Sequence, residues 1–552
     1  MRKGILKEFS PSPQVSHKTL HSKMTKKKWL DNLIFVVAMA LALVALWSLA
    51  ALAVGNEFVL PNVSDVCREL GILLAEPSFY ANVGVTVGRA LFAFALSLVV
   101  ALALALLAHL YPVKRPIDAI VTLLRALPTM SIIFLCIVLF PSRVIGIVVT
   151  FLVAFPVMYA AFDSALAELR PLDDMCAVFD VGRLDKVRYV YLPYLPEHTY
   201  TQCRSAVALA VKVCIAGEAL ALPRSGIGVE MYVARVNLDT AALLAWTVAA
   251  LVCCYLMDGL FALSKGICRK IADKRDRADN EQSQIDDCVH GIASQTTDLS
   301  EGACGSADII ERDDSADNNV VVAPIALTDV GVRFGDNVLY DGLNITFAAN
   351  KLHVILGKSG CGKTTLLNVV AGLVSHTGTV SGAEQRSYVF QEPRLAETTV
   401  AANVKLVLNG KTDGEQQRVG RVESMLALAG LSGKGNRRVV TLSGGEAQRV
   451  SLARAFACDG VLLADEPMKS LDLGVKRKLY ATLDCLLTAR PRTVLYVTHD
   501  VEEAVMLADE VYIASGNPCN LQHVATVDTP RSKRDPWSNQ SVALRKMLED
   551  LV

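Results

Sequence analysis

The chain has 552 residues, 52% of them hydrophobic, and equal numbers of basic and acidic side chains, 55 of each. It is too long for one compact domain and suits two or three. The net charge of zero gives no reason to expect nucleic acid as a partner. The 14 cysteines form no CxxC pair and no Cys/His cluster with metal-site spacing, which argues against a structural metal site.

Composition divides the chain into four parts. Leu, Ala and Val dominate from about residue 30, whereas from about residue 323 onward the composition is that of a soluble α/β domain. The intervening polar stretch is rich in Asp, Ser, Asn and Glu without a sustained apolar period, which predicts a disordered acidic linker. We therefore expect a basic tail at 1–29, a membrane domain at 30–268, the linker at 269–322 and a second folded domain at 323–552.

Six apolar stretches in the membrane domain are each close to the roughly 20 residues that cross a bilayer. They lie at 33–54, 83–108, 123–140, 144–162, 205–222 and 241–263. The first stretch has a cleaved signal peptide as its alternative, but it exceeds the roughly 7–15 apolar residues of a signal sequence. The predicted architecture is an α-helical polytopic domain with about six spanning helices.

Basic residues indicate the orientation of these helices. Those at 26–28, 114–115, 170–188 and 269–277 all fall in alternate segments, and the opposite segments carry few. The positive-inside rule then places both termini and the second folded domain in the cytoplasm.

Two charged residues, Lys212 and Glu218, lie within the fifth apolar stretch. Intramembrane charges usually face a cavity or the interior of a helix bundle. Because the two are six residues apart they do not share a helix face, so we do not expect them to pair with each other. Two interpretations stay open for each: it lines a transport pathway, or a neighbouring helix neutralises it.

The strongest motif in the chain is a glycine-rich loop between an apolar strand, residues 352–356, and a helical stretch, residues 366–373. Strand, loop and helix in this order predict a phosphate-binding loop, whose glycines let backbone N–H groups point at phosphates. Lys363 neutralises β- and γ-phosphate charge, and the Thr364 hydroxyl is a Mg²⁺ ligand. The nucleotide-binding residues of the loop are Gly357, Lys358, Ser359, Gly360, Cys361, Gly362, Lys363, Thr364 and Thr365.

A second apolar strand, residues 461–464, ends in Asp465 and Glu466. An acid at a strand end beside a phosphate-binding loop can hold Mg²⁺, and we assign this role to Asp465. The adjacent Glu466 is placed to polarise the attacking water and is the expected catalytic base.

The motifs around this strand resemble those of ATP-binding-cassette (ABC) ATPases. The resemblance covers residues 324–552 and rests on the signature sequence Leu442-Ser443-Gly444-Gly445-Glu446-Ala447-Gln448-Arg449, together with Phe334, Gln391, Asp472 and His499 in the family's order. The resemblance implies an α/β P-loop ABC ATPase domain that hydrolyses ATP with Mg²⁺ as cofactor.

The resemblance also implies a role for each motif residue. Phe334 stacks on adenine, and Ser443, Gly444 and Gly445 bind the γ-phosphate of ATP held by the opposite subunit. Gln391 contacts Mg²⁺ or the attacking water, and His499 contacts the γ-phosphate. The expected catalytic residues are thus Glu466, His499 and Gln391, and the expected metal ligands are Thr364, Gln391 and Asp465.

A composite ATP site of this kind needs a phosphate-binding loop and a signature motif from different subunits. The chain has one of each. We therefore expect a homodimer, with a paralogous half-transporter as the alternative partner.

The segment 164–196 resembles the coupling loop of bacterial import permeases. Aligned on Leu192-Pro193, Asp174-Met175-Cys176 occupy the positions of Glu-Ala-Ala in that pattern, and Asp180 replaces its Gly. More widely, residues 82–260 resemble permeases of the nitrate, sulfonate and taurine importer family. The motifs that carry this resemblance are Thr86 with Arg89, Arg125-Ala126-Leu127-Pro128-Thr129, and Glu218 followed by Arg224-Ser225-Gly226-Ile227-Gly228.

Taken together, the chain is predicted to be an importer half-transporter of the bacterial cytoplasmic (inner) membrane, with permease and ATPase in one polypeptide. The family implies a small solute, such as nitrate, a sulfonate, taurine or a vitamin precursor, and a separate extracytoplasmic solute-binding protein to deliver it. The alternatives are an ABC exporter and a non-transporting, nucleotide-dependent membrane sensor.

Overall fold

The computed structural model describes residues 41–56, 59–266, 324–408, 414–469 and 472–551, together with Phe35, Ala38 and Met39. The tail predicted at 1–29 and the linker predicted at 269–322 lie outside these residues. The chain divides into two compact units. The first comprises Met1–Val100, Ile120–Val157 and Arg204–Phe261, and the second comprises Ala101–Ala119, Met158–Cys203 and Ala262–Val552.

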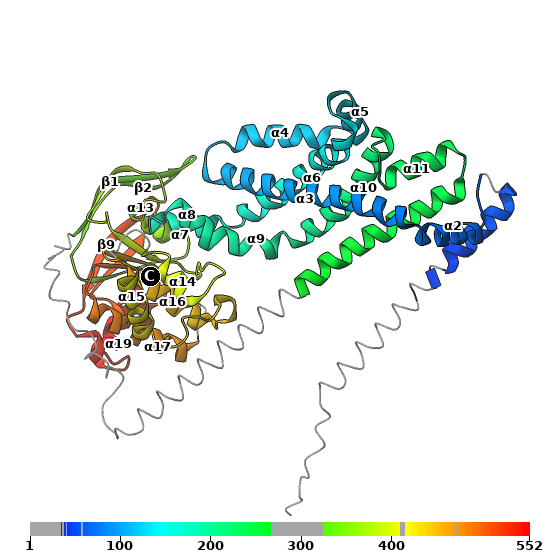
Figure 1. Cartoon of the computed structure of the whole chain (residues 1–552). Helices are drawn as coiled ribbons and strands as arrows, with labels where there is room; N and C mark the ends of the chain where they lie inside the picture. The colour runs from blue at the N-terminus through cyan, green and yellow to red at the C-terminus, as the bar shows by residue number, and fades with distance from the viewer. Residues whose placement is uncertain are drawn as a thin grey trace, which may run out of the picture. The chain divides into compact units, whose positions relative to one another are not determined.

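Long apolar helices dominate the N-terminal half (Figure 1). Three of them are long and apolar enough to cross a membrane: α3 (Pro77–Leu110), α6 (Ser142–Ala167) and the helix Thr240–Gly266. The shorter helices α2 (Val63–Ala75) and α11 (Ile227–Val236) accompany them. These helices fit the predicted membrane domain.

The other three predicted spans are not among these helices. The stretch 123–140 is not one helix, because α4 (Lys114–Ala126) and α5 (Thr129–Leu139) meet at an angle of 100°. Pro128 lacks a backbone N–H and disfavours helical backbone at Leu127, which accounts for the break. The expectation of a continuous third helix was therefore wrong.

The first predicted span is described only in part, whereas the fifth is weaker than expected. Within the first, the described helix covers only Leu41–Val54. In the fifth, α10 (Tyr200–Ala221) has sufficient length but carries three charged residues, Arg204, Lys212 and Glu218. It is therefore not among the helices that are apolar enough to cross a membrane. Among the described residues the structure thus supports three spanning helices, or four if the bent pair forms one span.

Glu218 is fully buried and is neutralised by the neighbouring helix α3. Its carboxylate accepts hydrogen bonds from the Arg89 guanidinium at 2.7 Å and from the Thr86 hydroxyl at 2.7 Å. Thr86 in turn accepts from the backbone N–H of Ile227, and Arg89 donates to the carbonyl of Ser225. Of the two interpretations left open for Glu218, a charge neutralised by a neighbouring helix is confirmed.

Lys212 behaves differently from Glu218. Its side chain is exposed in the middle of α10, and among the described residues it makes no ion pair. For this residue the interpretation as a pathway-lining charge stays open.

Two sheets form the frame of the C-terminal domain. A three-stranded antiparallel sheet has the order β2 (Asn337–Phe347), β1 (Ile325–Phe334) and β4 (Thr377–Ser381). The second sheet has six strands in the order β5-β6-β7-β3-β8-β9, and every neighbouring pair in it is parallel except β8 and β9. Its strands are β5 (Arg386–Val389), β6 (Val461–Asp465), β7 (Val494–Thr498), β3 (Leu352–Leu356), β8 (Glu510–Ser515) and β9 (Asn520–Thr526).

The central strands of this sheet are short, continuous apolar runs. Every residue of β3, β6 and β7 is buried. Parallel strands with both faces covered require such runs. The strands predicted at 352–356 and 461–464 are confirmed, and the α/β class predicted for the C-terminal domain is confirmed with them.

Seven α-helices accompany these sheets in the described part of the C-terminal domain (Figure 1). They are α13 (Lys363–Val370), α14 (Val400–Lys405), α15 (Glu415–Leu428), α16 (Gly444–Ala457), α17 (Leu473–Ala489), α18 (Val501–Leu507) and α19 (Asn539–Leu551). Helix α13 begins three residues before the predicted stretch 366–373, because the chain turns into the helix directly from the last glycine of the loop.

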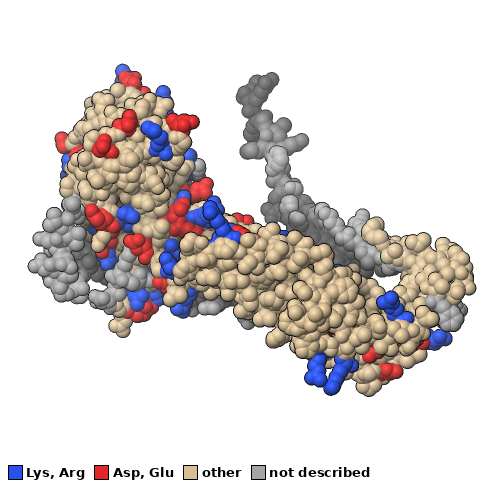
Figure 2. Space-filling model, turned by 90° about the horizontal axis from the view of Figure 1, so that it is seen from above, with Lys and Arg blue, Asp and Glu red and all other residues tan. Residues whose placement is uncertain are grey.

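Charge is distributed unevenly over the two halves of the chain. In Figure 2 most of the visible surface of the apolar helices carries no charged side chain, whereas Lys, Arg, Asp and Glu are scattered over the C-terminal domain. The exposed side chains of the helices include large apolar residues such as Phe92, Leu123 and Phe134. An uncharged apolar surface of this kind suits a lipid environment rather than water.

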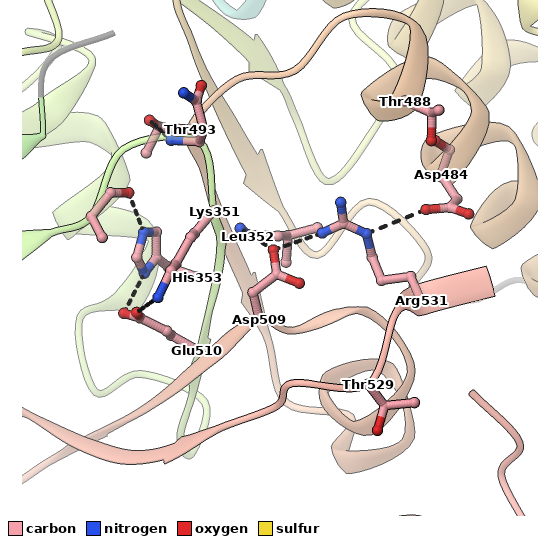
Figure 3. Close-up of polar contacts among 12 residues, drawn as sticks. Lys351, Leu352, His353, Asp484, Thr488, Thr493, Asp509, Glu510, Thr529 and Arg531 are labelled. Carbon is pink, nitrogen blue, oxygen red and sulfur yellow. Dashed lines mark hydrogen bonds and ion pairs between the residues drawn. The ribbon is translucent and has the colours of Figure 1, made fainter. Parts of the chain in front are cut away.

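A polar network joins the amino ends of β3 and β8, at the edge of the sheet opposite the phosphate-binding loop (Figure 3). The buried His353 bonds through Nε2 to the carbonyl of Ala348 at 2.8 Å, and its Nδ1 lies 3.2 Å from the Glu510 carboxylate. Lys351 also pairs with Glu510. Burial lowers the pKa of His353, although Glu510 and the Ala348 carbonyl oppose that shift.

The network predicts a loss of stability in mild acid. Below about pH 6.5 the unfolded chain protonates this histidine, whereas the folded domain with its lowered pKa does not until lower pH. The unfolded state then binds more protons, so the free energy of unfolding falls as the pH falls, by at most about 1.4 kcal/mol per pH unit. We expect the melting temperature of the C-terminal domain to drop by about 2–4 °C between pH 7 and pH 5.5 through this group.

Differential scanning fluorimetry of the full chain in nanodiscs measures this effect. His353→Gln should remove that part of the pH dependence, and the exposed-histidine control His523→Gln should retain it. Equal pH dependence in all three proteins would contradict the assignment to His353.

Candidate functional site

The glycine-rich loop wraps around its own lysine. Gly360 and Gly362 have φ values of 85° and 105°, in a region that favours glycine. Lys363 opens α13 and is buried, and its ammonium donates to the carbonyls of Gly357 at 2.6 Å and Lys358 at 2.8 Å. Lys358, Ser359 and Thr364 are exposed on the same loop. The loop therefore presents a helix N-terminus and a fixed positive charge, which together suit a phosphate group.

A position that suits a metal ion lies where this loop faces β6. The Thr364 hydroxyl donates to the Asp465 carboxylate at 3.0 Å. Burial raises the pKa of Asp465, the neighbouring Glu466 adds to that effect, and the bond from Thr364 opposes it. A hydroxyl and a carboxylate are hard oxygen donors of the kind that Mg²⁺ prefers, so these two residues fit a Mg²⁺ ion held together with nucleotide phosphates.

Glu466 forms a compact group with His499 and Lys469. His499 follows β7, and its Nδ1 lies 3.1 Å from one oxygen of Glu466, while the Lys469 ammonium lies 3.1 Å from the other. Burial would raise the pKa of Glu466, but hydrogen bonds from His499 and Lys469 outweigh burial and lower it. The carboxylate is therefore ionised at neutral pH and can accept a proton from water.

The backbone at Glu466 is unusual. Its φ is 40°, in the left-handed region that residues other than glycine seldom adopt. Its backbone N–H donates to Val497 of the neighbouring strand at 2.9 Å, which holds this conformation. Left-handed backbone at a non-glycine residue clusters at functional sites, and here it supports a catalytic assignment for Glu466.

Gln391 and Phe334 are placed at the margins of this site. Gln391 follows β5 by two residues, and its side chain is exposed at the carboxyl end of the same sheet. Phe334 ends β1, and its ring is 53% exposed although it is strongly apolar. An exposed aromatic ring at a strand end can stack on a nucleotide base, so both positions agree with the predicted roles.

The signature residues form the start of α16. Ser443 is the N-cap residue, and it forms a capping box with Glu446. Lys434 and Arg437 bind the Glu446 carboxylate from the other side. Although burial opposes the shift, bonds from Ser443 and Lys434 lower the pKa of Glu446 to about 2. Ser443 and Gly444 remain exposed at the helix N-terminus, and such an end attracts anions.

The segment predicted to be a coupling loop is folded into helices. It contains α7 (Arg170–Val178), α8 (Arg183–Asp185), a π-helix (Lys186–Tyr191) and α9 (Leu192–His198). Met175, Cys176 and Phe179 are buried. Asp180, which stands where the family pattern has Gly, has a φ of 53°. Aspartate tolerates this left-handed conformation better than most residues, which explains how the substitution preserves the turn.

This helical segment contacts the loop that follows Gln391. The Arg394 guanidinium donates to the carbonyl of Pro171 at 3.0 Å and lies 3.2 Å from the Asp174 carboxylate. It also lies over the ring of Phe390, next to Gln391. The buried Arg454 of α16 donates to the carbonyl of Arg394, and its guanidinium faces the ring of Phe179. One short loop thus joins the candidate nucleotide site to α7.

The structure therefore brings most of the predicted site residues together along one edge of one sheet. Ser443, Gly444 and Gly445 lie at a separate place, the start of α16. Sequence reasoning missed Lys469, Arg394 and Arg454. Lys469 stands three residues after Glu466, which was a usable signal, whereas the burial of Arg454 has no signature in a single sequence.

The C-terminal domain is similar to known ATP-binding proteins. The ABC transporter family model matches residues 340–469. The aliphatic sulfonates import ATP-binding protein SsuB of Frankia casuarinae is 39% identical over 217 residues, which cover 39% of this chain and 70% of that protein. The aliphatic sulfonates import ATP-binding protein SsuB 1 of Frankia alni is 40% identical over 217 residues, which cover 38% of this chain and 79% of that protein.

A similar solved structure is a dimeric ATP-binding cassette in a post-hydrolysis state bound to ADP and Pi. It is 26% identical, with a TM-score of 0.33, and the match covers 37% of this chain and all of that one.

The assignment of Glu466 as catalytic base predicts that replacing its carboxylate by an amide strongly lowers the ATPase rate. Glu466→Gln removes the ionised carboxylate while keeping its shape, so the steady-state ATPase rate should fall by about 100-fold or more, while ATP binding persists. A coupled-enzyme ATPase assay and fluorescent-nucleotide titration measure the two quantities. The control Glu423→Gln, an exposed carboxylate on α15, should leave both unchanged. A Glu466→Gln protein within threefold of the native rate would exclude this base.

Proposed function

This chain belongs to the ABC transporter family, and on that premise we propose that it is one half of an ATP-driven importer with permease and ATPase in a single polypeptide. Its ATPase domain hydrolyses ATP, and the proposal extends this activity to movement of a solute through the apolar helices. The observation that carries the proposal is the contact of Arg394, beside Gln391, with Pro171 and Asp174 of α7.

Coupling would use this contact as a mechanical link. Gln391 is the expected sensor of Mg²⁺ and the attacking water, and it stands three residues before Arg394. A shift of the Gln391 loop on ATP hydrolysis would therefore move α7, which precedes α9 and α10 in the helical part of the chain. Rigid-body motion of packed helices is a common means of switching access in such proteins.

The proposed unit is a homodimer. The γ-phosphate site predicted at Ser443 and Gly444 opens α16, and these residues are exposed. One chain holds one phosphate-binding loop and one signature motif, and an isolated copy cannot supply both to one nucleotide from opposite subunits. Two copies would bind two Mg-ATP between them.

In the proposed transporter the chain would cross the membrane six times. Three are the long apolar helices, and the bent pair of α4 and α5 would supply the fourth. The helix Leu41–Val54 and α10 would complete the set, because the buried charge of Glu218 is neutralised by Arg89 and costs less than an isolated charge in lipid. Both termini would then lie in the cytoplasm of a bacterial cell, with the permease in its inner membrane.

An anionic solute is the class that fits best. The curated relatives are named for import of aliphatic sulfonates. Lys212 is exposed on α10 and is not paired with any carboxylate among the described residues. A lysine in the middle of an apolar helix favours a hydrated pathway over lipid, where it would attract a sulfonate group. A separate solute-binding protein would deliver that solute.

Uptake into proteoliposomes tests the direction and the solute class. With ATP enclosed and radiolabelled taurine or methanesulfonate outside, together with a solute-binding protein from a neighbouring gene, we expect accumulation that Glu466→Gln abolishes. Lys212→Met should lower accumulation by about tenfold, because it removes the charge but keeps the length, and Lys212→Arg should retain it. Accumulation that needs external ATP and no binding protein would indicate an exporter instead.

The contact between Arg394 and Asp174 predicts uncoupling. Arg394→Ala and Asp174→Ala should each lower uptake by several-fold while the basal ATPase rate stays within about twofold of native. Because both changes break the same contact, the double variant should be no worse than Arg394→Ala alone. The control Arg188→Ala, an exposed arginine in the same helical segment, should transport normally. Additive losses in the double variant would contradict a shared contact.

A further inference from the structure

Two cysteines that the proposed mechanism does not use meet beneath the phosphate-binding loop. Cys361 belongs to the loop and is partly exposed, and Cys519 is buried in the turn between β8 and β9. Their side chains interact, because each one shifts the pKa of the other, and neither thiol is in a disulfide. The two residues are 158 positions apart in the sequence, so only the fold brings them together.

Strand β2 contacts both the loop that carries Cys361 and the turn that carries Cys519. The backbone N–H of Cys519 donates to the carbonyl of Leu339 at 2.7 Å. The next residue, Tyr340, is buried and donates from its hydroxyl to the carbonyl of Gly362 at 3.1 Å. A Cβ atom at Gly362 would lie 3.2 Å from the Leu339 methyl groups, so the loop is packed tightly against β2. Strand β2 therefore brings the loop and the turn, and with them the two cysteines, close to each other.

The surroundings of Cys361 favour its thiolate. The Lys363 ammonium lies 3.8 Å from the Cys361 sulfur. The hydrogen bond from Cys519 and the charge of Lys363 outweigh burial and lower the pKa of Cys361 to about 6. The pKa of Cys519 is raised, chiefly by the same hydrogen bond. A thiolate is the nucleophile in cysteine oxidation, so Cys361 is the reactive member and Cys519 is the resolving thiol.

We propose that Cys361 and Cys519 are a peroxide-sensitive pair whose disulfide reversibly blocks nucleotide binding at this loop. The Cys361 thiolate attacks one oxygen of hydrogen peroxide and becomes a sulfenic acid, and the other oxygen leaves as hydroxide, which takes up a proton to form water. The Cys519 sulfur then attacks the sulfenic sulfur, the S–S bond forms and a second water leaves with the Cys519 proton. Two thiols are oxidised and one peroxide is reduced.

The geometry explains why this bond would block the site. A disulfide requires the sulfur atoms to approach to about 2.05 Å, which is closer than two unbonded sulfur atoms can lie. The approach pulls Cys361 toward the β8–β9 turn, and the flanking Gly360 and Gly362, both with left-handed φ, yield most easily. It also removes the thiolate beside Lys363 and so changes the position of the ammonium that faces the phosphates. A cytoplasmic dithiol would reverse the bond by exchange.

Peroxide treatment of the full chain in nanodiscs tests this proposal. After a short exposure to hydrogen peroxide we expect a cross-linked peptide that contains Cys361 and Cys519 in a non-reduced digest, found by mass spectrometry. The ATPase rate should fall at least tenfold and return on addition of dithiothreitol. Saturating Mg-ATP during the exposure should protect both the thiols and the rate, because the nucleotide covers the loop.

The variant Cys519→Ser distinguishes disulfide formation from other oxidative damage to the loop. Serine keeps the size and the hydrogen bond, so the untreated variant should hydrolyse ATP within about twofold of the native rate. Without a resolving thiol, Cys361 is expected to proceed to sulfinic acid, which dithiothreitol does not restore. The control Cys485→Ser, in α17, should behave as the native chain. Cys519→Ala serves the same comparison if the serine variant does not fold.

Three results would each overturn the proposal. They are the absence of the cross-linked peptide in the oxidised native chain, a cross-link that leaves the ATPase rate unchanged, and recovery of Cys519→Ser by dithiothreitol to the same extent as the native chain.

Discussion

Strand β7 is hydrogen-bonded to β3 on one side and to β6 on the other, all three parallel, and the candidate site depends on this alignment. Because the strands run in the same direction, their carboxyl ends meet at one edge. The phosphate-binding loop follows β3, Asp465 and Glu466 end β6, and His499 follows β7. The short contacts of Thr364 with Asp465 and of Glu466 with His499 are consequences of that register. A strand displaced in the order would separate these groups.

The opposite edge of the same sheet, at the amino ends of the parallel strands, has a structural role. There the amino ends of β3 and β8 are joined by His353, Lys351 and Glu510, and by Asp509 and Arg531 (Figure 3). These charges are paired among themselves, so they stabilise the sheet without being available to a ligand. The acidic and basic groups at the loop edge are only partly satisfied within the chain, which is the difference expected between a structural network and a site.

Buried charge also organises the rest of the chain. Glu218 ties α10 to α3 through Arg89 and Thr86 and holds the turn before α11, where a Cβ atom at Gly226 would lie 2.5 Å from the carboxylate. In the C-terminal domain, the buried Arg454 fixes the loop of Arg394 against Phe179. In both places one charged side chain joins segments far apart in sequence, and removal of one partner would leave the other buried and unpaired.

Local sequence determined the nucleotide-binding half of this protein almost completely. The glycine spacing, the buried strand runs and the acidic pair at the end of β6 each depend on a few adjacent residues, so the glycine-rich loop, the strands beside it and the ATPase family could be predicted from them. The membrane half was less predictable, because hydropathy reports length and polarity but not direction. The third expected span is broken at Pro128, and the fifth, α10, carries charges that set it apart from the apolar spanning helices. Only the tertiary structure decided that Arg89 neutralises Glu218, that Arg394 joins the Gln391 loop to α7, and that Cys361 lies against Cys519. Each of these contacts spans more than a hundred residues, and a single sequence carries no periodic or local signal for side chains that only the folded chain brings together.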